Sequence, residues 1–308
     1  MKANSSYRSS ILIIYTGGTI GMKTDEETGA LVPFDFSGIY EEFPSLRRLN
    51  VDIDVHTMPK LIDSSNVHPS DWCAIAEVIK ANYEKYDGFV ILHGTDTMSY
   101  TASALSFMLE GLDKPVILTG SQIPLSELRS DGRDNLITSV MIAGEGIARE
   151  VCLYFSAILL RGNRSRKMSA DGLVAFDSPG YPHLADVGIS VKYNYSAILP
   201  PREGGLRYHP FAKVPIGVLK VFPGIQFGLF EDIMTEKLSG IVLETFGAGN
   251  IPMGNGELLP IIKKATDMLK SLEIPFEVHI YSAHRTPEEA RDFALNARKN
   301  GFGCLIAA

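Results

Sequence analysis

Two hydroxyl-rich segments of this chain each follow a short apolar run that predicts a β-strand. Residues 16–19, Thr-Gly-Gly-Thr, follow the run 11–15, and residues 93–98, His-Gly-Thr-Asp-Thr-Met, follow the run 89–92. In a parallel α/β sheet, ligands bind in the crevice beyond the carboxyl ends of the strands. We therefore expect both segments to contribute to one site.

A threonine hydroxyl is a poor nucleophile at neutral pH and needs a neighbouring base. Thr95 and Asp96 are adjacent in the second segment, and Lys167 is the one lysine of an otherwise arginine-rich loop at 161–167. Crowding by other cations favours the neutral amine of a lysine, which can then act as a base. The residue types thus permit a Thr-Lys-Asp relay, and the sequence alone leaves open whether the three side chains meet.

Each of these motifs also has a simpler interpretation. Residues 16–19 are compatible with a tight turn or a phosphate-binding loop, although they lack the Lys-Ser/Thr ending of a P-loop and the third glycine of a dinucleotide fingerprint. Residues 95–97 are typical of a helix N-cap, and 63–65, Asp-Ser-Ser, have an ordinary turn composition. The basic run 161–167 is typical of a solvated loop, and His93 of a polar residue near a strand end.

The elements that position these motifs alternate between short β-rich runs and helical patterns. This alternation predicts a three-layer α/β fold around a mostly parallel sheet. Helices are expected from residue 68, over about 99–112 and over about 134–147; further strands are expected over 115–119, 151–156, 215–221 and 239–244. The polar segment 23–29 is expected to be a mobile loop of the kind that acts as a lid.

A proline- and glycine-rich stretch divides the chain. It predicts a large N-terminal catalytic domain over residues 1–190, an inter-domain connection over 191–212 and a smaller flavodoxin- or Rossmann-like α/β domain over 213–308.

Composition excludes several classes of protein. The 308 residues are 45% hydrophobic and 21% charged with a net charge of −7, which is typical of a globular protein and argues against nucleic-acid or anionic-membrane partners. No apolar run reaches the ~20 residues of a membrane span, and no leader peptide is evident, so we expect a cytoplasmic protein. Cys73, Cys152 and Cys304 are too scattered for a disulfide framework or a Cys-x-x-Cys zinc site.

Five motifs in a fixed order resemble the bacterial L-asparaginase family, specifically its cytosolic type I branch. They are Tyr15-Thr16-Gly17-Gly18-Thr19-Ile20-Gly21, Asp63-Ser64-Ser65, His93-Gly94-Thr95-Asp96-Thr97-Met98, Gly120-Ser121-Gln122 and Arg129-Ser130-Asp131-Gly132. The resemblance extends from about residue 9 to about residue 267. It implies an amidohydrolase that needs no metal or cofactor and converts L-asparagine to L-aspartate and ammonia.

The resemblance also implies roles for individual residues. Thr19 would attack the side-chain amide carbon and form an acyl-enzyme, while Lys167 and Asp96 tune the hydroxyl of Thr95 and Asp96 also binds the substrate's α-ammonium. Backbone amides near Thr95 would stabilise the oxyanion. The implied substrate-binding residues are Asp63, Ser64, Ser65, Gly94 and Asn250. Asn250 matches a residue that the neighbouring subunit supplies, which implies a homodimer or homotetramer.

The first departure from this family concerns a tyrosine. Many relatives carry one in the loop after the first motif, whereas residues 23–34 contain none and Tyr40 is remote in sequence. Either another residue replaces the tyrosine or catalysis is altered.

The second departure begins at residue 268. Residues 268–308, with Ser282-Ala283-His284-Arg285-Thr286-Pro287, resemble the aminoimidazole ribonucleotide carboxylase/mutase family of purine synthesis, whose catalytic histidine would be His284. The match covers about 40 residues and lacks that family's phosphate-binding loop and glycine-rich half. We therefore expect a chimera in which strands over 276–282 and 302–307 and a helix over 286–300 replace the segment that the asparaginase family uses.

The chimera leaves three hypotheses for function. The first is an asparaginase with weakened activity and without the cooperativity that the effector pocket of type I enzymes implies. The second is a chain related to the carboxylase/mutase, and the third is a small-molecule binding protein that does not turn asparagine over.

Overall fold

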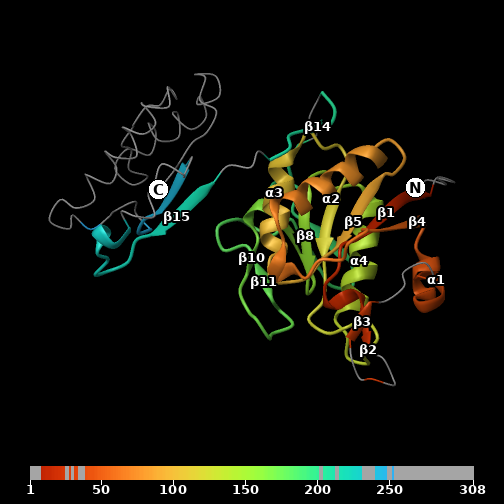
Figure 1. The fold of residues 1–308 in the computed structure, drawn as a ribbon. Coiled ribbons are helices and arrows are strands. Elements are labelled where there is room, and N and C mark those ends of the chain that lie inside the picture. The colour runs from red at the N-terminus through yellow and green to blue at the C-terminus, as the bar shows by residue number, and fades with distance from the viewer. Residues whose placement is uncertain are drawn as a thin grey trace. The chain divides into compact units, whose positions relative to one another are not determined.

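The computed structural model describes residues 8–24, 28, 31–33, 39–200, 204–211, 215–230, 240–247 and 252. The chain divides into two compact units, Met1–Phe211 and Ala212–Ala308. An eight-stranded sheet organises the first unit, and a pair of parallel strands organises the described part of the second (Figure 1).

The large sheet has the strand order β13-β12-β9-β8-β7-β5-β1-β4. Its strands are β1 (Ser9–Tyr15), β4 (Val51–Thr57), β5 (Gly88–Leu92), β7 (Val116–Thr119), β8 (Val151–Phe155), β9 (Ile158–Arg161), β12 (Ala185–Val187) and β13 (Val191–Tyr193). The pairings from β4 through β8 are parallel, and those from β8 through β13 are antiparallel. The prediction of a mostly parallel sheet is confirmed.

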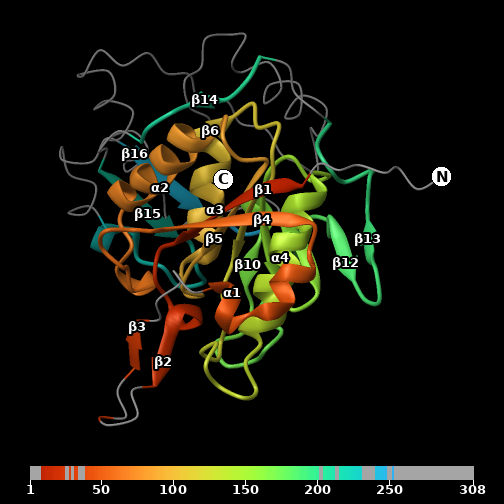
Figure 2. The ribbon, with the colours of Figure 1, turned by 90° about the vertical axis from the view of Figure 1, so that its right-hand side faces the viewer.

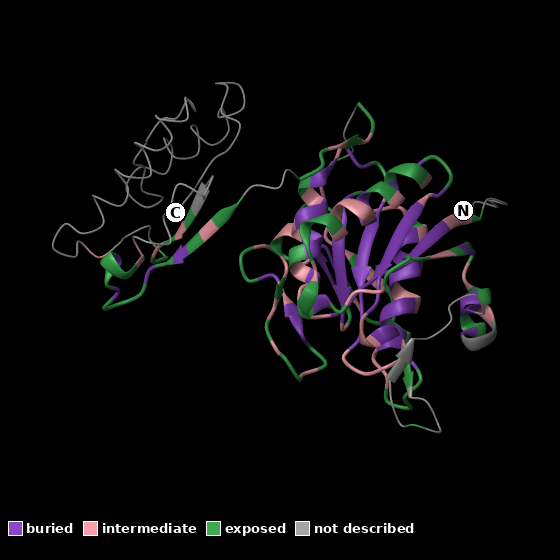
Figure 3. Cartoon of the chain, viewed as in Figure 1, coloured by how far each residue is buried: buried purple, intermediate pink, exposed green. Residues whose placement is uncertain are grey.

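Helices cover both faces of this sheet and make three layers (Figure 2). Helices α2 (Pro69–Asn82) and α3 (Met98–Met108) pack on one face, and α4 (Gly132–Glu145) packs on the other. Successive side chains of β1 divide between the two cores: Ile13 packs on the α4 side and Ile14 on the α2 and α3 side. This is the two-residue period of a strand buried on both faces, and all of β1 from Ile11 onward is buried (Figure 3).

Helix α3 is shorter than the sequence pattern predicts. The helix expected to reach residue 112 ends at Met108, because β6 (Leu109–Glu110) pairs with β14 (Arg207–Tyr208). The Glu110 carboxylate accepts a hydrogen bond from Arg207 Nη2 at 2.7 Å. Pairing with a segment almost a hundred residues away in sequence overrides the local helix preference. The helical period of the sequence could not reveal this strand pairing.

The remaining elements of the first unit are short. They are η1 (Thr19–Gly21), β2 (Met22–Thr24), β3 (Leu31–Pro33), α1 (Ile39–Glu42), η3 (Pro44–Arg48), η4 (Ser64–Asn66), η5 (Gly162–Arg164), β10 (Arg166–Lys167) and β11 (Phe176–Asp177). The first two residues of the segment expected to be a lid, 23 and 24, belong to β2, which pairs antiparallel with β3, and most of the remainder lies outside the described residues. The connection expected over 191–212 begins inside the large sheet, because β13 pairs with β12.

The second unit contains the parallel pair β15 (Ile216–Lys220) and β16 (Gly240–Glu244), with η6 (Phe227–Phe230) between them in sequence. Both strands lie where the sequence predicts them. The elements expected over 276–282, 286–300 and 302–307 lie outside the described residues. Across the part of the chain that is described, no helix is long and apolar enough to cross a bilayer.

Candidate active site

Three adjacent parallel strands end at the same edge of the sheet. Tyr15 of β1 is in register with Leu92 of β5, which is in register with Thr119 of β7. The segments that follow these strands are residues 16–19, 93–98 and 120–122. The expectation that the two threonine segments meet at one sheet edge is therefore confirmed, and the segment after β7 joins them.

Glycines allow the backbones of these segments to touch. A Cβ on Gly18, whose φ is +88°, would lie 2.4 Å from the Gly94 nitrogen, and a Cβ on Gly94 would lie 2.5 Å from Ser64 Oγ. A larger residue at Gly18 would displace the backbone of Gly94, and one at Gly94 would displace the Ser64 side chain. Thr19 follows Gly18 and Thr95 follows Gly94, so both threonines are neighbours of the same backbone contact.

Lys167 joins Thr95 to Asp96. Its Nζ donates to Thr95 Oγ1 at 2.9 Å and to Asp96 Oδ1 at 2.8 Å. The lysine side chain is 17% exposed, and that of Asp96 is 63% exposed. Lys167 reaches this position because β10 pairs with β11, where it lies opposite Phe176. The three side chains that the sequence offered as a relay are thus in contact.

Gln122 also lies at the site, although no role was predicted for this residue from the sequence. Thr95 Oγ1 donates to Gln122 Oε1 at 3.1 Å, and Gln122 Nε2 donates to the carbonyls of Ala170 and Gly172 at 3.1 and 3.2 Å. The two carbonyls fix which end of the amide faces Thr95. The hydroxyl of Thr95 consequently accepts from Lys167 and donates to Gln122. The position of Gln122 just after β7 is the signal that could have placed it here.

The start of α4 holds this segment in place. The Asp131 carboxylate accepts from the Gln122 nitrogen at 3.0 Å and from the Ile123 nitrogen at 3.0 Å. Asn135 Nδ2 donates to the Gly120 carbonyl at 3.0 Å. Both side chains satisfy backbone groups that the end of β7 leaves unpaired.

The segment 63–65 forms a turn beside the threonines. Asp63 Oδ1 accepts from the Ser65 nitrogen at 3.1 Å, and both residues are exposed, whereas Ser64 is buried. Thr97 Oγ1 donates to the Ser64 carbonyl at 2.7 Å. Thr97 occupies the N-cap position of α3, but its side chain makes no capping bond. The simpler interpretation of residues 95–97 as a helix N-cap is thus correct for the position of Thr97, while the hydroxyls of Thr95 and Thr97 bond to other loops.

His93 lies beneath the site and is 2% exposed. Its Nδ1 is 2.7 Å from the Gly94 carbonyl oxygen, and its Nε2 is 2.9 Å from Thr101 Oγ1. Burial lowers the pKa of His93, so the imidazole is neutral at pH 7. His93 is therefore a polar residue next to the end of β5, as expected, and it is buried and hydrogen-bonded at both ring nitrogens.

The tyrosines nearest the first motif are committed elsewhere. Tyr40 Oη accepts from the Ile53 nitrogen at 3.0 Å, and Tyr15 Oη donates to the Gly21 carbonyl at 2.8 Å. Burial raises the pKa of Tyr15 to about 12. Neither tyrosine is therefore placed as a base for Thr19.

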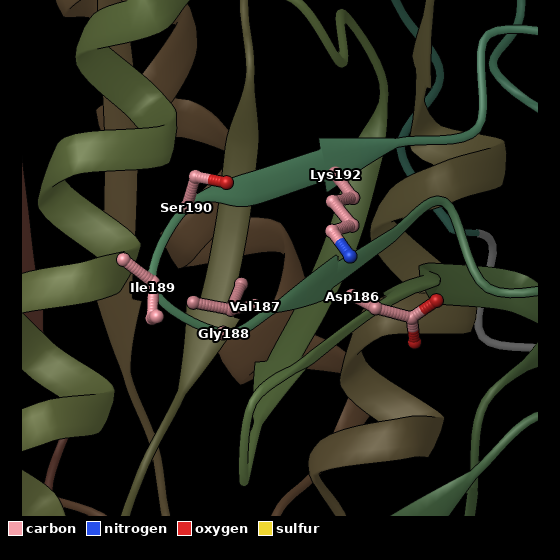
Figure 4. Close-up of a pocket in the computed structure, with 6 residues that line it drawn as sticks. All are labelled: Asp186, Val187, Gly188, Ile189, Ser190 and Lys192. Carbon is pink, nitrogen blue, oxygen red and sulfur yellow. The ribbon is translucent and has the colours of Figure 1, made fainter.

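A surface pocket of about 480 Å³ lies elsewhere, on the β12–β13 hairpin (Figure 4). Its lining residues are Asp186, Val187, Gly188, Ile189, Ser190 and Lys192, and it includes none of the candidate catalytic residues. The described residues hold no group of three or more His, Cys, Asp or Glu side chains that could bind a metal ion. Asn250 lies outside the described residues.

Comparison with known proteins agrees with this arrangement. Residues 10–199 match the family model of the N-terminal part of asparaginase. The chain belongs to the asparaginase family. It is 45% identical over 261 residues to L-asparaginase 1 of Escherichia coli K12, covering 84% of this chain and 77% of that protein.

Solved structures show the same fold. The L-asparaginase I of Vibrio cholerae has a TM-score of 0.78 at 44% identity, covering 85% of this chain and 79% of that one. The thermostable L-asparaginase of Thermococcus kodakarensis has a TM-score of 0.75 at 31% identity, covering 84% and 77%. The sequence-based assignment to a three-layer α/β asparaginase fold is confirmed.

Residues 250–308 match a different family model, that of AIR carboxylase. This match confirms the second resemblance and begins earlier than the residue 268 that the motifs indicate. The asparaginase-family chain therefore ends in a segment related to a second family.

Proposed function

We propose that this chain hydrolyses L-asparagine to L-aspartate and ammonia through a threonine nucleophile. Membership of the asparaginase family supports the reaction. The observation that carries the proposal is the contact of Lys167 with both Thr95 and Asp96, at 2.9 and 2.8 Å, next to the turn that bears Thr19. This contact supports a proton relay at the sheet edge where the two hydroxyl-bearing segments lie.

In the acylation step, Thr19 Oγ attacks the side-chain amide carbon of asparagine. The hydroxyl proton of Thr19 passes to the amide nitrogen, which leaves as ammonia, and an ester remains on Thr19. Negative charge that develops on the carbonyl oxygen needs fixed donors, and backbone N–H groups near Thr95 can supply them.

In the deacylation step, water attacks the ester and releases aspartate. One proton of the water returns to Thr19 Oγ, which restores the enzyme. Thr95 is the group that orients the water, because Lys167 and Gln122 hold its hydroxyl from two sides. Lys167 carries the proton, and Asp96 balances its charge.

The segment 63–65 and Gly94 would form the binding site for the amino-acid end of the substrate. The exposed Asp63 carboxylate and that of Asp96 attract the α-ammonium, while Ser64, Ser65 and nearby backbone amides hold the α-carboxylate. A carboxylate and an ammonium need such paired donors and acceptors to be recognised.

We further propose that the active protein is a cytoplasmic homodimer or homotetramer in which Asn250 of a neighbouring subunit completes the site, and that it binds neither nucleic acid nor membranes. The net charge of −7 supports the last point. Two domains, a catalytic one and a smaller α/β one, would build each subunit.

An ammonia-release assay with asparagine and with glutamine tests the proposed reaction. Ammonia is expected from asparagine, and the release is expected to disappear in Thr19→Ala and in Thr95→Ala. Thr57→Ala is the matched control, because Thr57 is an exposed threonine at the end of the neighbouring strand β4. Calorimetric binding of asparagine without ammonia release would instead indicate a binding protein.

A further inference from the structure

A chain of hydrogen bonds connects the helix layer to the backbone of the site. Trp72 Nε1, on α2, donates to Thr101 Oγ1, on α3, at 2.9 Å. Thr101 Oγ1 is 2.9 Å from His93 Nε2, and His93 Nδ1 is 2.7 Å from the Gly94 carbonyl oxygen. Thr101 is fully buried and His93 is 2% exposed, so neither side chain can satisfy its hydrogen bonds with bulk water.

The groups at the two ends of this series of hydrogen bonds determine which atom carries each proton. A carbonyl oxygen only accepts, so His93 Nδ1 carries the proton, and in a neutral imidazole Nε2 must then accept. An indole N–H only donates, so Thr101 Oγ1 accepts from Trp72 and gives its own proton to His93 Nε2. Trp72 and Thr101 therefore select one tautomer of His93.

In that tautomer, the bond from His93 Nδ1–H to the Gly94 carbonyl orients the peptide group between Gly94 and Thr95. The peptide bond is planar and trans, so the Thr95 N–H points away from the Gly94 carbonyl that His93 holds. Among the described residues, no backbone carbonyl accepts this N–H. The Thr95 N–H therefore points away from the buried imidazole of His93.

We propose that His93 is a positioning residue, whose Nδ1–H anchors the Gly94–Thr95 peptide and aims the Thr95 N–H at the carbonyl oxygen of the substrate. The proposal rests on the proposed asparaginase reaction, in which that oxygen becomes negatively charged. A donor to the peptide carbonyl also polarises the N–H on the other side of the same peptide. Thr101 and Trp72 act through His93, and none of the three touches the substrate.

Two substitutions of His93 separate its hydrogen bond to the Gly94 carbonyl from its contact with Thr101. In His93→Asn the amide nitrogen can replace Nδ1 and keep the bond to the Gly94 carbonyl, whereas in His93→Gln the amide reaches toward Thr101 and the carbonyl loses its donor. A misdirected oxyanion donor costs up to about a hundredfold in rate. We expect kcat to fall about 10- to 100-fold in His93→Gln with little change in KM, and to recover in His93→Asn to within about fivefold of wild type.

Thr101→Val is a second route to the same test, in case the His93 variants do not fold. It removes the hydroxyl that selects the tautomer and keeps the shape of the side chain. Thr119→Val is the matched control: Thr119 is also fully buried, but its hydroxyl donates to the Tyr154 carbonyl at 2.9 Å, outside the chain. Trp72 is the sole tryptophan, so a shift in its emission in Thr101→Val, and not in Thr119→Val, shows that its hydrogen bond is broken.

A measurement independent of activity separates this proposal from the proposed function. In protein labelled with ¹⁵N-histidine, which contains seven histidines, the resonances lost in His93→Gln identify His93. A protonated Nδ1 and an unprotonated Nε2 at pH 7 are expected, with this signature weakened in Thr101→Val. An Nε2–H tautomer overturns the proposal, as does an unchanged kcat in His93→Gln. Wild-type protein that shows the Nδ1–H tautomer but releases no ammonia contradicts only the proposed function.

Discussion

The ammonium group of Lys167 makes two hydrogen bonds. It donates to Thr95 and to Asp96, while Thr95 passes its own proton toward Gln122. The ion pair with Asp96 contributes about 0–1 kcal/mol to folding, because the carboxylate is 63% exposed. So small a contribution to folding is consistent with the proposed role of Lys167 in proton transfer.

We predict that Lys167→Met lowers kcat about a hundredfold or more, since proton transfer by a positioned group contributes that much. Lys167→Arg is expected to be equally impaired, because a guanidinium does not lose its proton. Steady-state ammonia release measures both. Lys192→Met, an exposed lysine on β13, is the control. Full activity in Lys167→Arg would show that a fixed positive charge suffices and that no proton moves through this residue.

At the residue scale, the sequence identified the chemistry but not all of its participants. The residue types of Thr95, Asp96 and Lys167 indicated a relay, and the structure brings the three together. Gln122 was missed because its role depends on two carbonyls about fifty positions later in the chain. A contact of this kind leaves no periodic signal.

At the scale of elements, the junction between η1 and the end of β5 depends on glycine. Gly18 has φ +88° and lies against the backbone of Gly94, whereas Gly146, at the end of α4, has φ +66° and open space around it. Both positions have a positive φ, but Gly146 is left-handed helical with ψ 19°, whereas Gly18 has ψ 168°, a region that essentially only glycine occupies. Gly146 is therefore the milder comparison for a substitution at Gly18.

Gly146→Ala is predicted to cost about 1–2 kcal/mol in unfolding free energy, from the left-handed backbone alone. Gly18→Ala is predicted to cost roughly 2–5 kcal/mol, because its glycine-only backbone conformation and a clash with the Gly94 backbone both oppose a side chain. Only Gly18→Ala is expected to reduce activity, by about a hundredfold, since it displaces the Thr19 turn. Urea denaturation and ammonia release check both variants. Equal costs at the two positions would mean that the segments separate without penalty.

A histidine clamp holds the element that supports Lys167. His183 Nδ1 is 2.8 Å from Asp186 Oδ1 on β12, and Nε2 is 3.1 Å from Asp177 Oδ1 on β11, the partner strand of β10. These carboxylates, with Asp186 the stronger influence, raise the pKa of His183 above its usual 6.5.

The direction of this shift predicts how stability depends on pH. Because the pKa is higher in the folded chain than in the unfolded one, the stabilising contribution is complete below pH 6.5 and is lost as the pH rises through the folded pKa. The urea midpoint of the wild type is expected to fall more than that of His183→Gln between pH 6 and pH 8.5. Parallel pH profiles for the two proteins would show that the clamp is not charged.

At the scale of the whole molecule, the chain combines two families. The asparaginase model covers residues 10–199, and the AIR carboxylase model covers residues 250–308. In the type I enzymes that this chain resembles, the segment replaced here is expected to contribute to subunit contacts and to an effector pocket. We therefore expect the replacement to affect regulation more than the chemistry of the first unit.

We predict weakened activity and a hyperbolic dependence of the rate on asparagine concentration, with a Hill coefficient near one. Initial rates over a wide range of asparagine concentrations test this prediction. Sedimentation velocity at the assay concentration determines whether dimers or tetramers carry the activity. A sigmoidal rate curve would show that the effector pocket survives the replacement.

The sequence by itself determined the class of fold, the family, the presence of a segment from a second family and the side chains proposed for the chemistry. These depend on strand and helix periods and on short motifs, which are local properties of the chain. Only the tertiary structure decided that Lys167 reaches Thr95, that α3 stops at Met108 where β6 pairs with β14, and that His93 lies between the Gly94 carbonyl and the Thr101 hydroxyl. Each of these depends on groups from different elements of the fold, whose hydrogen bonds form only when the sheet and its helices have assembled.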